Sequence, residues 1–289
     1  MNNRNGILLM LFAMAGFTLE DVFIKQLSST FSTSQILMTS GVFGSLFFAG
    51  ASVAKGHTVF RTNVWTRASI FRMLGEAIAA VSFVKALSLI PLSTVAAVFQ
   101  VTPLAITMGA ALFLGEQVGW RRWAAIAVGF IGVMLIIKPG VAGFDPSVFW
   151  VILAVSGVVL RDLMTRVIPQ QVSSSIISLQ AFLAAIIVSL LLLLFTSDNL
   201  KTVSPESSLL FAGAIVFGIV GYYAIVAAMR IGDASIVAPF RYTRLLFSLA
   251  TGMIIFEERL DALSLLGALI IISTGLYTFL RERKLSLGD

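Results

Sequence analysis

Two arginines inside an apolar run are the residues of this sequence best suited to binding chemistry. Arg241 and Arg244 are three residues apart, so on a helix they share one face. An arginine at membrane depth costs roughly 2.5–3.5 kcal/mol on insertion scales, so we expect it to face a cavity or a partner. The pair predicts a fork that binds a carboxylate, a phosphate or a polarised carbonyl group. The alternative is a structural ion pair with Glu76, Asp162 or Glu20.

A carboxylate in another apolar run is the second candidate. Arg72 and Glu76 are four residues apart, so a local ion pair is one interpretation. Glu76 is also suited to carry a coupling proton or to act as a counter-ion to Arg241, because a buried carboxylate must be neutralised. Glu20 belongs to the same group of candidates and is expected to face the core.

Polar and aromatic residues could complete a binding site. Gln100 offers both donor and acceptor groups. Aromatic side chains stack on planar substrates, and the candidates are Phe83, Phe99, Tyr223 and Tyr242. The chain has 23 Phe residues, so packing against other helices or lipid is the competing interpretation for each ring. Asp21 and Lys25, four residues apart, are interpreted as a local pair or as interfacial residues.

The composition defines the class of protein. Of 289 residues, 58% are apolar and 12% are charged, and the mean hydropathy is +0.99. A soluble domain has about 25% charged residues, so these values indicate a multi-pass membrane protein in a lipid bilayer. The net charge of +6 comes from basic residues in short loops, which favours membrane topology over nucleic acid binding.

Several kinds of chemistry lack the residues they need. The chain has no cysteine and one histidine, His57, so a thiolate or histidine metal site and a His-based catalytic triad are excluded. It has no G-x-x-x-x-G-K-[ST] phosphate loop and no G-x-S-x-G or H-E-x-x-H motif. The sequence therefore predicts no enzyme, no catalytic residues, no metal and no cofactor.

Apolar runs predict ten membrane-spanning helices, because a span needs about 20 apolar residues and must satisfy its own backbone. The predicted spans are Gly6–Leu27, Gln35–Ala54, Ala68–Leu89, Ser93–Leu114, Trp120–Ile137, Val148–Ile168, Ser174–Phe195, Ser208–Met229, Ala234–Phe256 and Ala262–Leu280. Proline residues 91, 103 and 239 remove helix hydrogen bonds and predict bends.

An internal repeat organises these spans. Ala86–Pro139 aligns with Ala227–Leu280 without a gap at an offset of 141, so that Gln100 corresponds to Arg241 and Glu116 to Glu257. The two glutamates are predicted to cap the N-termini of the fifth and tenth helices. Five helices per half place the halves in opposite orientations, so we predict an all-α fold of two inverted repeats, 1–139 and 148–289, with a linker at 140–147.

Loop charge predicts the orientation. With the N-terminus inside, the cytoplasmic segments carry most of the basic residues, namely Arg4, Lys55, Arg61, Arg67, Arg121, Arg122, Arg166, Arg230, Arg281, Arg283 and Lys284. The outside segments carry only Lys138, Lys201 and Arg259. Both termini are therefore predicted to be cytoplasmic.

These features resemble the EamA family of the drug/metabolite transporter superfamily. The resemblance rests on ten helices in two halves, a Glu closing the fourth and ninth helices, and the segments Ala238–Arg244, Ile255–Arg259 and Gly275–Tyr277. It extends to a bacterial subgroup often labelled riboflavin or S-adenosylmethionine transporters. The resemblance implies a central cavity lined by the third, fourth, eighth and ninth helices.

The sequence thus predicts a secondary transporter of the bacterial inner membrane that works by alternating access. Its small-molecule substrate is expected to be polar or aromatic, of an amino-acid, nucleotide or flavin type, with an anionic or carbonyl group. The competing hypothesis is an intramembrane enzyme acting on a lipid-borne substrate, and a third is a passive scaffold or receptor. Substrate, direction, coupling ion and oligomeric state are left open.

Overall fold

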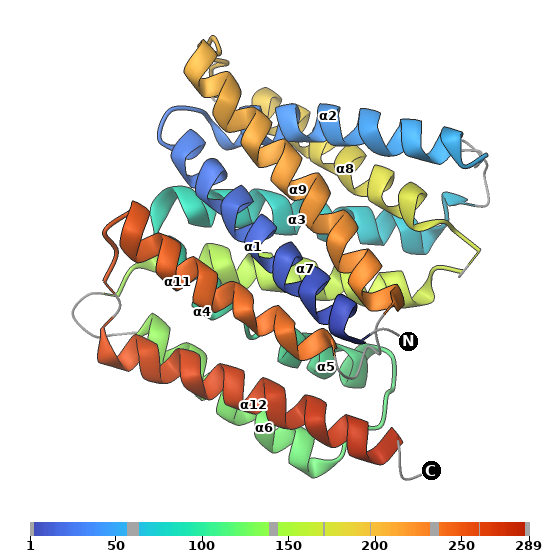
Figure 1. Cartoon of the computed structure of the whole chain (residues 1–289), viewed down its shortest axis with the longest axis vertical. Coiled ribbons are helices and arrows are strands. Elements are labelled where there is room, and N and C mark those ends of the chain that lie inside the picture. Colours follow the sequence, from blue (N-terminus) through green and yellow to red (C-terminus); the bar gives the residue numbers. More distant parts are fainter. Residues whose placement is uncertain are drawn as a thin grey trace. The chain divides into compact units, whose positions relative to one another are not determined.

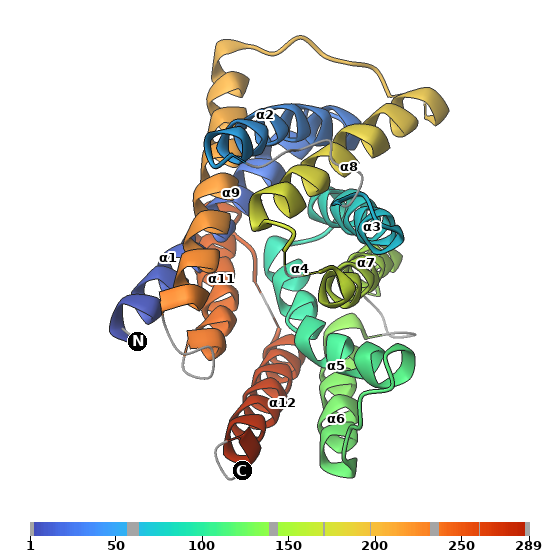
Figure 2. The same ribbon diagram turned by 90° about the vertical axis from the view of Figure 1, so that its right-hand side faces the viewer.

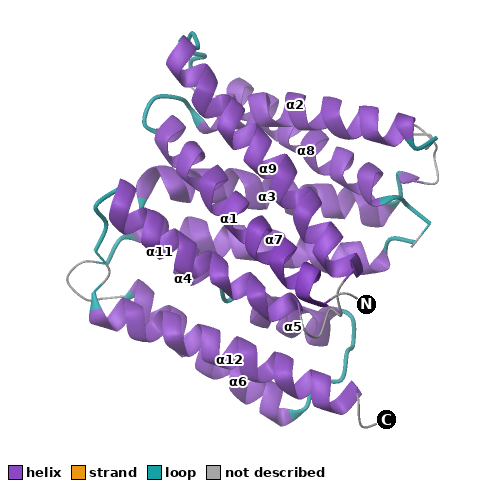
Figure 3. Cartoon of the chain, in the orientation of Figure 1, coloured by secondary structure: helices purple, strands orange, loops and turns teal. Residues whose placement is uncertain are grey.

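The computed structural model of the chain describes residues 3–56, 64–138, 144–169, 171–196, 198–231, 237–259 and 261–286. Within these ranges the chain forms helices and connecting turns, without strands (Figure 3). His57, residues 140–143 of the predicted linker and the start of the ninth predicted span lie outside the described residues.

The helices follow the predicted spans closely (Figure 1). They are α1 (Asn3–Ser28), α2 (Thr33–Ala54), α3 (Arg67–Leu89), α4 (Leu92–Phe99), α5 (Thr102–Phe113), α6 (Trp120–Ile137), η2 (Pro146–Val148), α7 (Phe149–Val167), α8 (Ser174–Phe195), α9 (Pro205–Ile231), η3 (Ala238–Tyr242), α11 (Thr243–Ile255) and α12 (Ala262–Ser286). Continuous apolar sequence forms helices here because a helix satisfies its backbone groups within one segment.

Eight helices of the described part are long and apolar enough to cross a membrane. This makes the chain a multi-pass membrane protein. The predicted third and ninth spans are not among the eight. The third, α3, contains Arg72, Glu76 and Lys85, and the ninth contributes only the 13-residue helix α11 after the short η3.

The internal repeat extends to helices outside the segment in which it was first recognised. Helices α2 and α8 both have 22 residues, and their first residues, Thr33 and Ser174, are 141 positions apart, which is the offset of the repeat. The side chains of Ser32 and Ser173 cap them, accepting hydrogen bonds from the backbone N–H groups of Gln35 and Ser175. The same offset therefore relates the capping serines as well as the helices.

Corresponding helices run antiparallel where they pack together. Along α6 and α12, Gly129 faces Thr274 and Gly132 faces Gly267, so the chain advances on one helix as it returns on the other. A Cβ atom on Gly132 would lie 2.8 Å from the carbonyl oxygen of Gly267, which shows how closely the backbones approach. Antiparallel packing of equivalent helices is the arrangement expected for repeats of opposite orientation.

The chain forms two compact units, and each combines parts of both sequence halves. Unit 1 comprises Met1–Val22, Leu89–Val148 and Val216–Asp289. Unit 2 comprises Phe23–Ser88 and Phe149–Ile215. Unit 1 therefore holds α4, α5, α6, η3, α11 and α12 with most of α1 and the later part of α9, and unit 2 holds α2, α3, α7 and α8.

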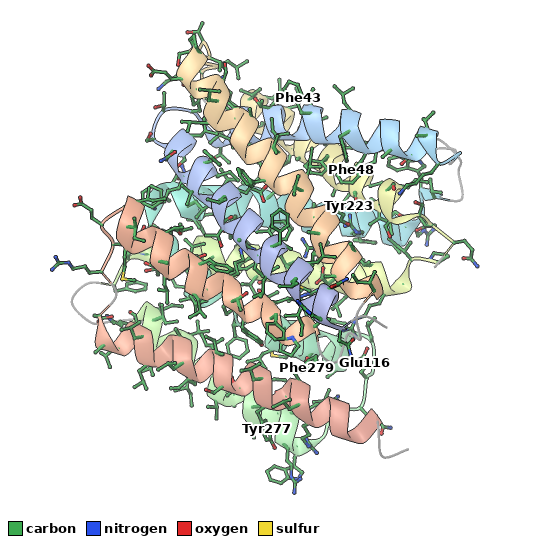
Figure 4. The ribbon with its side chains drawn as sticks, in the orientation of Figure 1. Phe43, Phe48, Glu116, Tyr223, Tyr277 and Phe279 are labelled. Carbon is green, nitrogen blue, oxygen red and sulfur yellow. The ribbon has the colours of Figure 1, made fainter. Side chains whose placement is uncertain are left out.

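Two tight helix pairs build unit 2. Helices α2 and α8 lie side by side (Figures 1 and 2), and the rings of Phe48, labelled in Figure 4, and Phe182 stack between them with their centroids 5.5 Å apart. Helices α3 and α7 cross at Gly75 and Gly157, where an added Cβ atom on Gly157 would lie 2.5 Å from the backbone nitrogen of Ala79. Small residues are what allow membrane helices to approach this closely.

Unit 1 contains two interrupted helices at equivalent positions of the repeat. The predicted fourth span divides into α4 and α5, and the ninth into η3 and α11. Helix α5 begins at Thr102 and α11 at Thr243, which is the offset of 141 again. Each threonine hydroxyl donates to the carbonyl oxygen three residues earlier, on Phe99 and Phe240 respectively, at 2.5 and 2.6 Å. Pro103 and Pro239 lie beside these interruptions, as their helix-breaking chemistry predicts.

The repeat changes register before the far ends of these helices. At the end of α5, Gly115 has φ 69° and the N–H of Glu116 donates to Ala110. At the end of α11, Glu257 has φ 54° and the N–H of Glu258 donates to the carbonyl oxygen six residues earlier. Both ends have the hydrogen-bond pattern of a Schellman motif, so Glu258 is the structural counterpart of Glu116 and the ungapped alignment was wrong by one residue here.

Whereas the sequence predicted Glu257, the glutamate of the second half that caps a helix is Glu258. Its carboxylate accepts hydrogen bonds from the backbone N–H groups of Leu92 at 2.7 Å and Ser93 at 2.9 Å, and from the Ser93 hydroxyl at 2.7 Å. It therefore caps α4, whereas the sequence predicted caps on the fifth and tenth helices. Glu257 and Glu116 are exposed. The cap connects the end of α11 to the start of α4, because a carboxylate is stabilised at a helix N-terminus.

A second connection joins α6 to α12 in unit 1. Lys138, which ends α6 with a left-handed backbone, forms an ion pair with Asp261. Asp261 also caps α12 by accepting from the N–H of Ser264. The hydrogen bonds from Lys138 and Ser264 lower the pKa of Asp261 to about 2, so this carboxyl group is ionised at neutral pH.

We predict that Gly157→Ala destabilises the protein. The added methyl group meets backbone atoms of α3 that cannot move independently, and overpacking of this kind costs about 1–3 kcal/mol. The melting temperature of the purified protein in detergent should fall. The matched control is Gly50→Ala on α2, where the new Cβ atom has open space and the melting temperature should be unchanged or slightly higher. Equal melting temperatures for the two variants would contradict the prediction.

We also predict a graded loss of stability at Glu258. Glu258→Ala removes an acceptor of three hydrogen bonds, a loss of about 1–3 kcal/mol, and Glu258→Gln should fall between it and the wild type because an amide oxygen retains part of the cap. Thermal unfolding in detergent measures the effect. Glu257→Gln is the control, and an equal loss at both positions would show that the cap is not the cause.

Candidate functional site

A buried ion pair joins α1 to α11 in unit 1. One guanidinium nitrogen of Arg244 donates to both carboxylate oxygens of Asp21, at 2.9 and 2.7 Å. The Asp21 side chain is 3% exposed and the Arg244 side chain 22% exposed. Both helices belong to apolar runs, so each charge supplies the neutralisation that the other requires.

Two phenylalanine rings lie beside this pair. The guanidinium carbon of Arg244 is 5.4 Å from the ring centroid of Phe17 and 6.0 Å from that of Phe99. Phe17 is one helical turn before Asp21 on α1, and Phe99 is the last residue of α4. Planar guanidinium groups stack favourably on aromatic faces, so the rings help to orient Arg244.

The interrupted helices supply three of the other predicted residues. Gln100 ends α4 and is half-buried at the interruption before α5. Arg241 lies in η3 and is exposed. Tyr242 ends η3 and is half-buried, with its hydroxyl group packed against Gly275 of α12. Of the two arginines, Arg241 therefore belongs to η3 and Arg244 to the regular helix α11.

The two remaining predicted residues of unit 1 lie on or against α9. Glu20 is half-buried on α1, and its carboxylate packs against Gly218, where a side chain would collide with it. Tyr223 is 72% exposed on α9 (Figure 4). Glu20 is thus packed within the unit while Tyr223 lies on its surface.

Glu76 and Phe83 belong to unit 2. Glu76 lies between two arginines, 3.6 Å from Arg72 on its own helix and 3.5 Å from Arg161 on α7. The pairing with Arg72 is the local one that the spacing of four residues indicated. Phe83 is half-buried further along α3. A role of Glu76 and Phe83 in substrate binding stays a prediction. Within unit 2, Glu76 belongs to a network of charged side chains.

That network ties three helices of unit 2 together. Buried Arg72 also donates to the hydroxyl of Thr165 on α7 at 3.1 Å and to the carbonyl oxygen of Ile177 on α8 at 3.3 Å. Arg161 donates to Asp162 at 2.8 Å. Two arginines and two acidic residues thus balance within α3 and α7, which fits a structural role in helix packing.

Asp21 was not predicted to be the partner of Arg244. It was interpreted as an interfacial residue or as a partner of Lys25, whereas it pairs with Arg244 and the Lys25 ammonium donates to the carbonyl oxygen of Leu87. The sequence did contain one signal. An aspartate recurs at this position of the repeat, because Asp162 corresponds to Asp21 at the offset of 141. Phe17 was also missed, although it shares a helix face with Asp21.

The arrangement in unit 1 offers an acid, a base and two aromatic faces in one place. Asp21 can accept from an ammonium or hydroxyl group, Arg244 can donate to a carboxylate or carbonyl group, and Phe17 and Phe99 can stack on a planar ring. Among the described residues, no three His, Cys, Asp or Glu side chains converge on a metal position. The chemistry available here is recognition by hydrogen bonds, charge and stacking.

Comparison with known proteins identifies related transporters, including one that matches nearly the whole chain. An S-adenosylmethionine uptake transporter of Rickettsia conorii is 28% identical over 280 residues, covering 96% of this chain and 94% of the relative. A riboflavin transporter of Vibrio cholerae is 31% identical over 184 residues, covering 61% and 58%. One crystal structure of a protein matches with a TM-score of 0.62 at 16% identity, covering 97% of this chain and 98% of the other, which is a likeness of fold alone.

Comparison with family models also identifies transporters as relatives of this chain. The model of the EamA-like transporter family matches twice, at residues 4–138 and at 145–280. The two matches together include every helix that contributes to the Asp21–Arg244 pair and its aromatic neighbours. This multi-pass membrane protein belongs to the EamA-like transporter family.

Proposed function

We propose that the chain is a secondary transporter that moves a small metabolite across the bacterial inner membrane by alternating access. The observation that carries the proposal is the Arg244–Asp21 pair beside two interrupted helices. Interrupted helices with polar groups at the break are the usual form of a substrate site in secondary transporters. The names of the relatives support transport and not catalysis.

The proposed topology has ten helices in two inverted repeats, at 1–139 and 148–289, with both termini in the cytoplasm. The two family matches and the antiparallel packing of equivalent helices support the inversion. The excess of Lys and Arg in one set of loops supports the orientation. Helix α3 and the segment of α11 are the two further proposed spans, in addition to the eight that are long and apolar enough to cross a membrane. The charged residues of α3 are neutralised in part by the network around Glu76.

The proposed substrate is a small metabolite with a planar nitrogen-containing ring and a polar tail. S-adenosylmethionine and riboflavin, named for the relatives, both have such a ring. Phe17 and Phe99 suit the ring by stacking. Asp21 and Arg244 suit a tail with both a positive and a negative group, such as the amino-acid end of S-adenosylmethionine, which could exchange with the ion pair one charge at a time.

The proposal assigns different roles to the remaining candidates. Gln100 and Arg241 are polar groups at the two interruptions that orient the tail, and Tyr242 is held against α12. Glu76, which lies 3.6 Å from Arg72 and 3.5 Å from Arg161, is proposed to carry a coupling proton. Glu20, packed against α9, contributes a further acceptor near the site.

Transport by purified protein tests the function directly. The protein in proteoliposomes is expected to exchange radiolabelled S-adenosylmethionine or riboflavin for an unlabelled pool of the same compound on the other side. Exchange should saturate and should exceed that of empty liposomes. A pH gradient across the membrane tests the coupling proton, with Glu76→Gln as the variant that should lose the response. Absence of saturable flux for both compounds would overturn the proposed substrate class.

We predict that Arg244→Lys impairs transport nearly as severely as Arg244→Ala. A lysine ammonium can still donate to Asp21, but it lacks the planar face that lies beside the rings of Phe17 and Phe99 and the further N–H groups that a substrate would use. The loss of charged hydrogen bonds to the substrate lowers affinity roughly ten- to a hundredfold. Equilibrium binding and exchange rates measure the effect. Full activity in a well-folded Arg244→Ala protein would exclude this arginine from the site.

A double variant separates substrate binding from helix packing. Asp21→Asn or Arg244→Gln alone leaves one buried charge without its partner, so each is expected to lower the melting temperature. The combination Asp21→Asn with Arg244→Gln removes both charges and should recover much of the stability. If the pair binds substrate, the recovered protein stays inactive. If it also recovers transport, the pair serves folding only.

The topology makes its own prediction. Alkaline phosphatase fused after Asp289 should be inactive, because that enzyme needs the oxidising side of the membrane, and a fusion in the loop near Lys201 should be active. Expression of each fusion is checked by immunoblot. Activities in the reverse order would show that the chain has the opposite orientation.

A further inference from the structure

A groove between α6 and α12 is separate from the residues assigned to transport. It has a volume of about 400 Å³ and is formed by unit 1 alone. Helix α6 contributes Trp120, Arg121, Ala124, Ala125 and Val128, and α12 contributes Ser273, Thr274 and Tyr277. Tyr277 projects from α12 on the side of α6 (Figure 4).

The lining of the groove changes from polar to apolar along α6. Trp120 and Arg121 lie at the first turn of the helix, and the Arg121 guanidinium is 5.4 Å from the Trp120 ring. The later α6 residues of the groove, ending at Val128, are small and apolar. Trp120 is 74% exposed and Tyr277 48% exposed, although both are large rings. Trp and Tyr residues are enriched at the interface of a bilayer, where the ring is in acyl chains and the polar atom is near the headgroups.

We propose that this groove binds an anionic phospholipid. Arg121, at the same end of the groove as the exposed Trp120, supplies the charged partner for a phosphate group, since Arg binds phosphate through charged hydrogen bonds. Beyond Arg121 the groove continues along α6 past Ala124, Ala125 and Val128, and an acyl chain attached to the bound headgroup could lie along these apolar residues. A cation above an apolar strip is complementary to an anionic lipid, and a basic residue near such a surface contributes roughly a fivefold gain in affinity.

Quenching of tryptophan fluorescence tests the proposal on the whole protein. The protein is reconstituted in phosphatidylcholine vesicles that contain about 10% of a lipid with brominated acyl chains, either phosphatidylglycerol or phosphatidylcholine. Lipid that merely surrounds the protein quenches equally with both headgroups. A selective groove gives stronger quenching by brominated phosphatidylglycerol, and this excess should disappear in Trp120→Phe because that ring reports on the groove.

Charge variants identify the site of the selectivity. Arg121→Gln should lower the apparent affinity for brominated phosphatidylglycerol roughly fivefold. Arg67→Gln is the matched control, because Arg67 is an exposed arginine at the start of α3 in unit 2 and the same charge is removed. It should retain the excess quenching. Equal quenching by the two brominated lipids in the wild type, or an excess that survives Arg121→Gln, overturns the proposal.

A second copy of the chain is the other occupant that such a groove could have. Light scattering of the protein in detergent, with and without phosphatidylglycerol, distinguishes it. A monomer in both conditions supports the lipid. A dimer that is lost in Ala124→Trp, a change that fills the groove, together with no lipid selectivity, would show that the groove is a contact between copies.

Discussion

The positive charge of Arg244 must be neutralised inside an apolar bundle, and much of unit 1 is arranged around this requirement. Asp21 supplies the negative charge from α1, so α1 has to lie against α11 at this level. Phe17 and Phe99 then surround the guanidinium group from α1 and α4. An isolated charge at this depth would be costly, whereas a pair with these hydrogen bonds is tolerated. The ion pair that we propose for substrate recognition is therefore also one that fixes helix positions.

The two halves of the internal repeat are alike at the helix interruptions, where α5 and α11 begin, and differ where these two helices end. Thr102 and Thr243 begin equivalent helices with the same hydrogen bond, although Arg244 corresponds to Pro103. Beyond this point α11 is one residue longer than α5. The added residue moves the capping role in the second half to Glu258. Two halves with one backbone plan thus differ in the side chains that carry charge.

The lengths of the apolar runs predicted the helices well because lipid permits few alternatives. Continuous apolar runs gave the bounds of α6 and α8 to the residue, since each is bordered by a polar turn. The interruptions were harder to locate, because Pro103 and Pro239 predict a bend without specifying whether the helix continues through it. The partner of Arg244 was beyond the reach of spacing rules. Asp21 is 223 residues away in the chain, and only tertiary packing brings the two together.

The distribution of charge bears on how such a protein could move. The Asp21–Arg244 pair closes within unit 1, and Glu76 with Arg72 and Arg161 closes within unit 2. A compact body whose buried charges are paired internally can change its surroundings without uncovering an unpaired charge, which is the costly event in lipid. Under the proposed alternating access, the barrier to movement would then come from packing and from the substrate. A substrate with both charges could replace the contacts of Asp21 and Arg244 in turn, so that neither is left alone during transport.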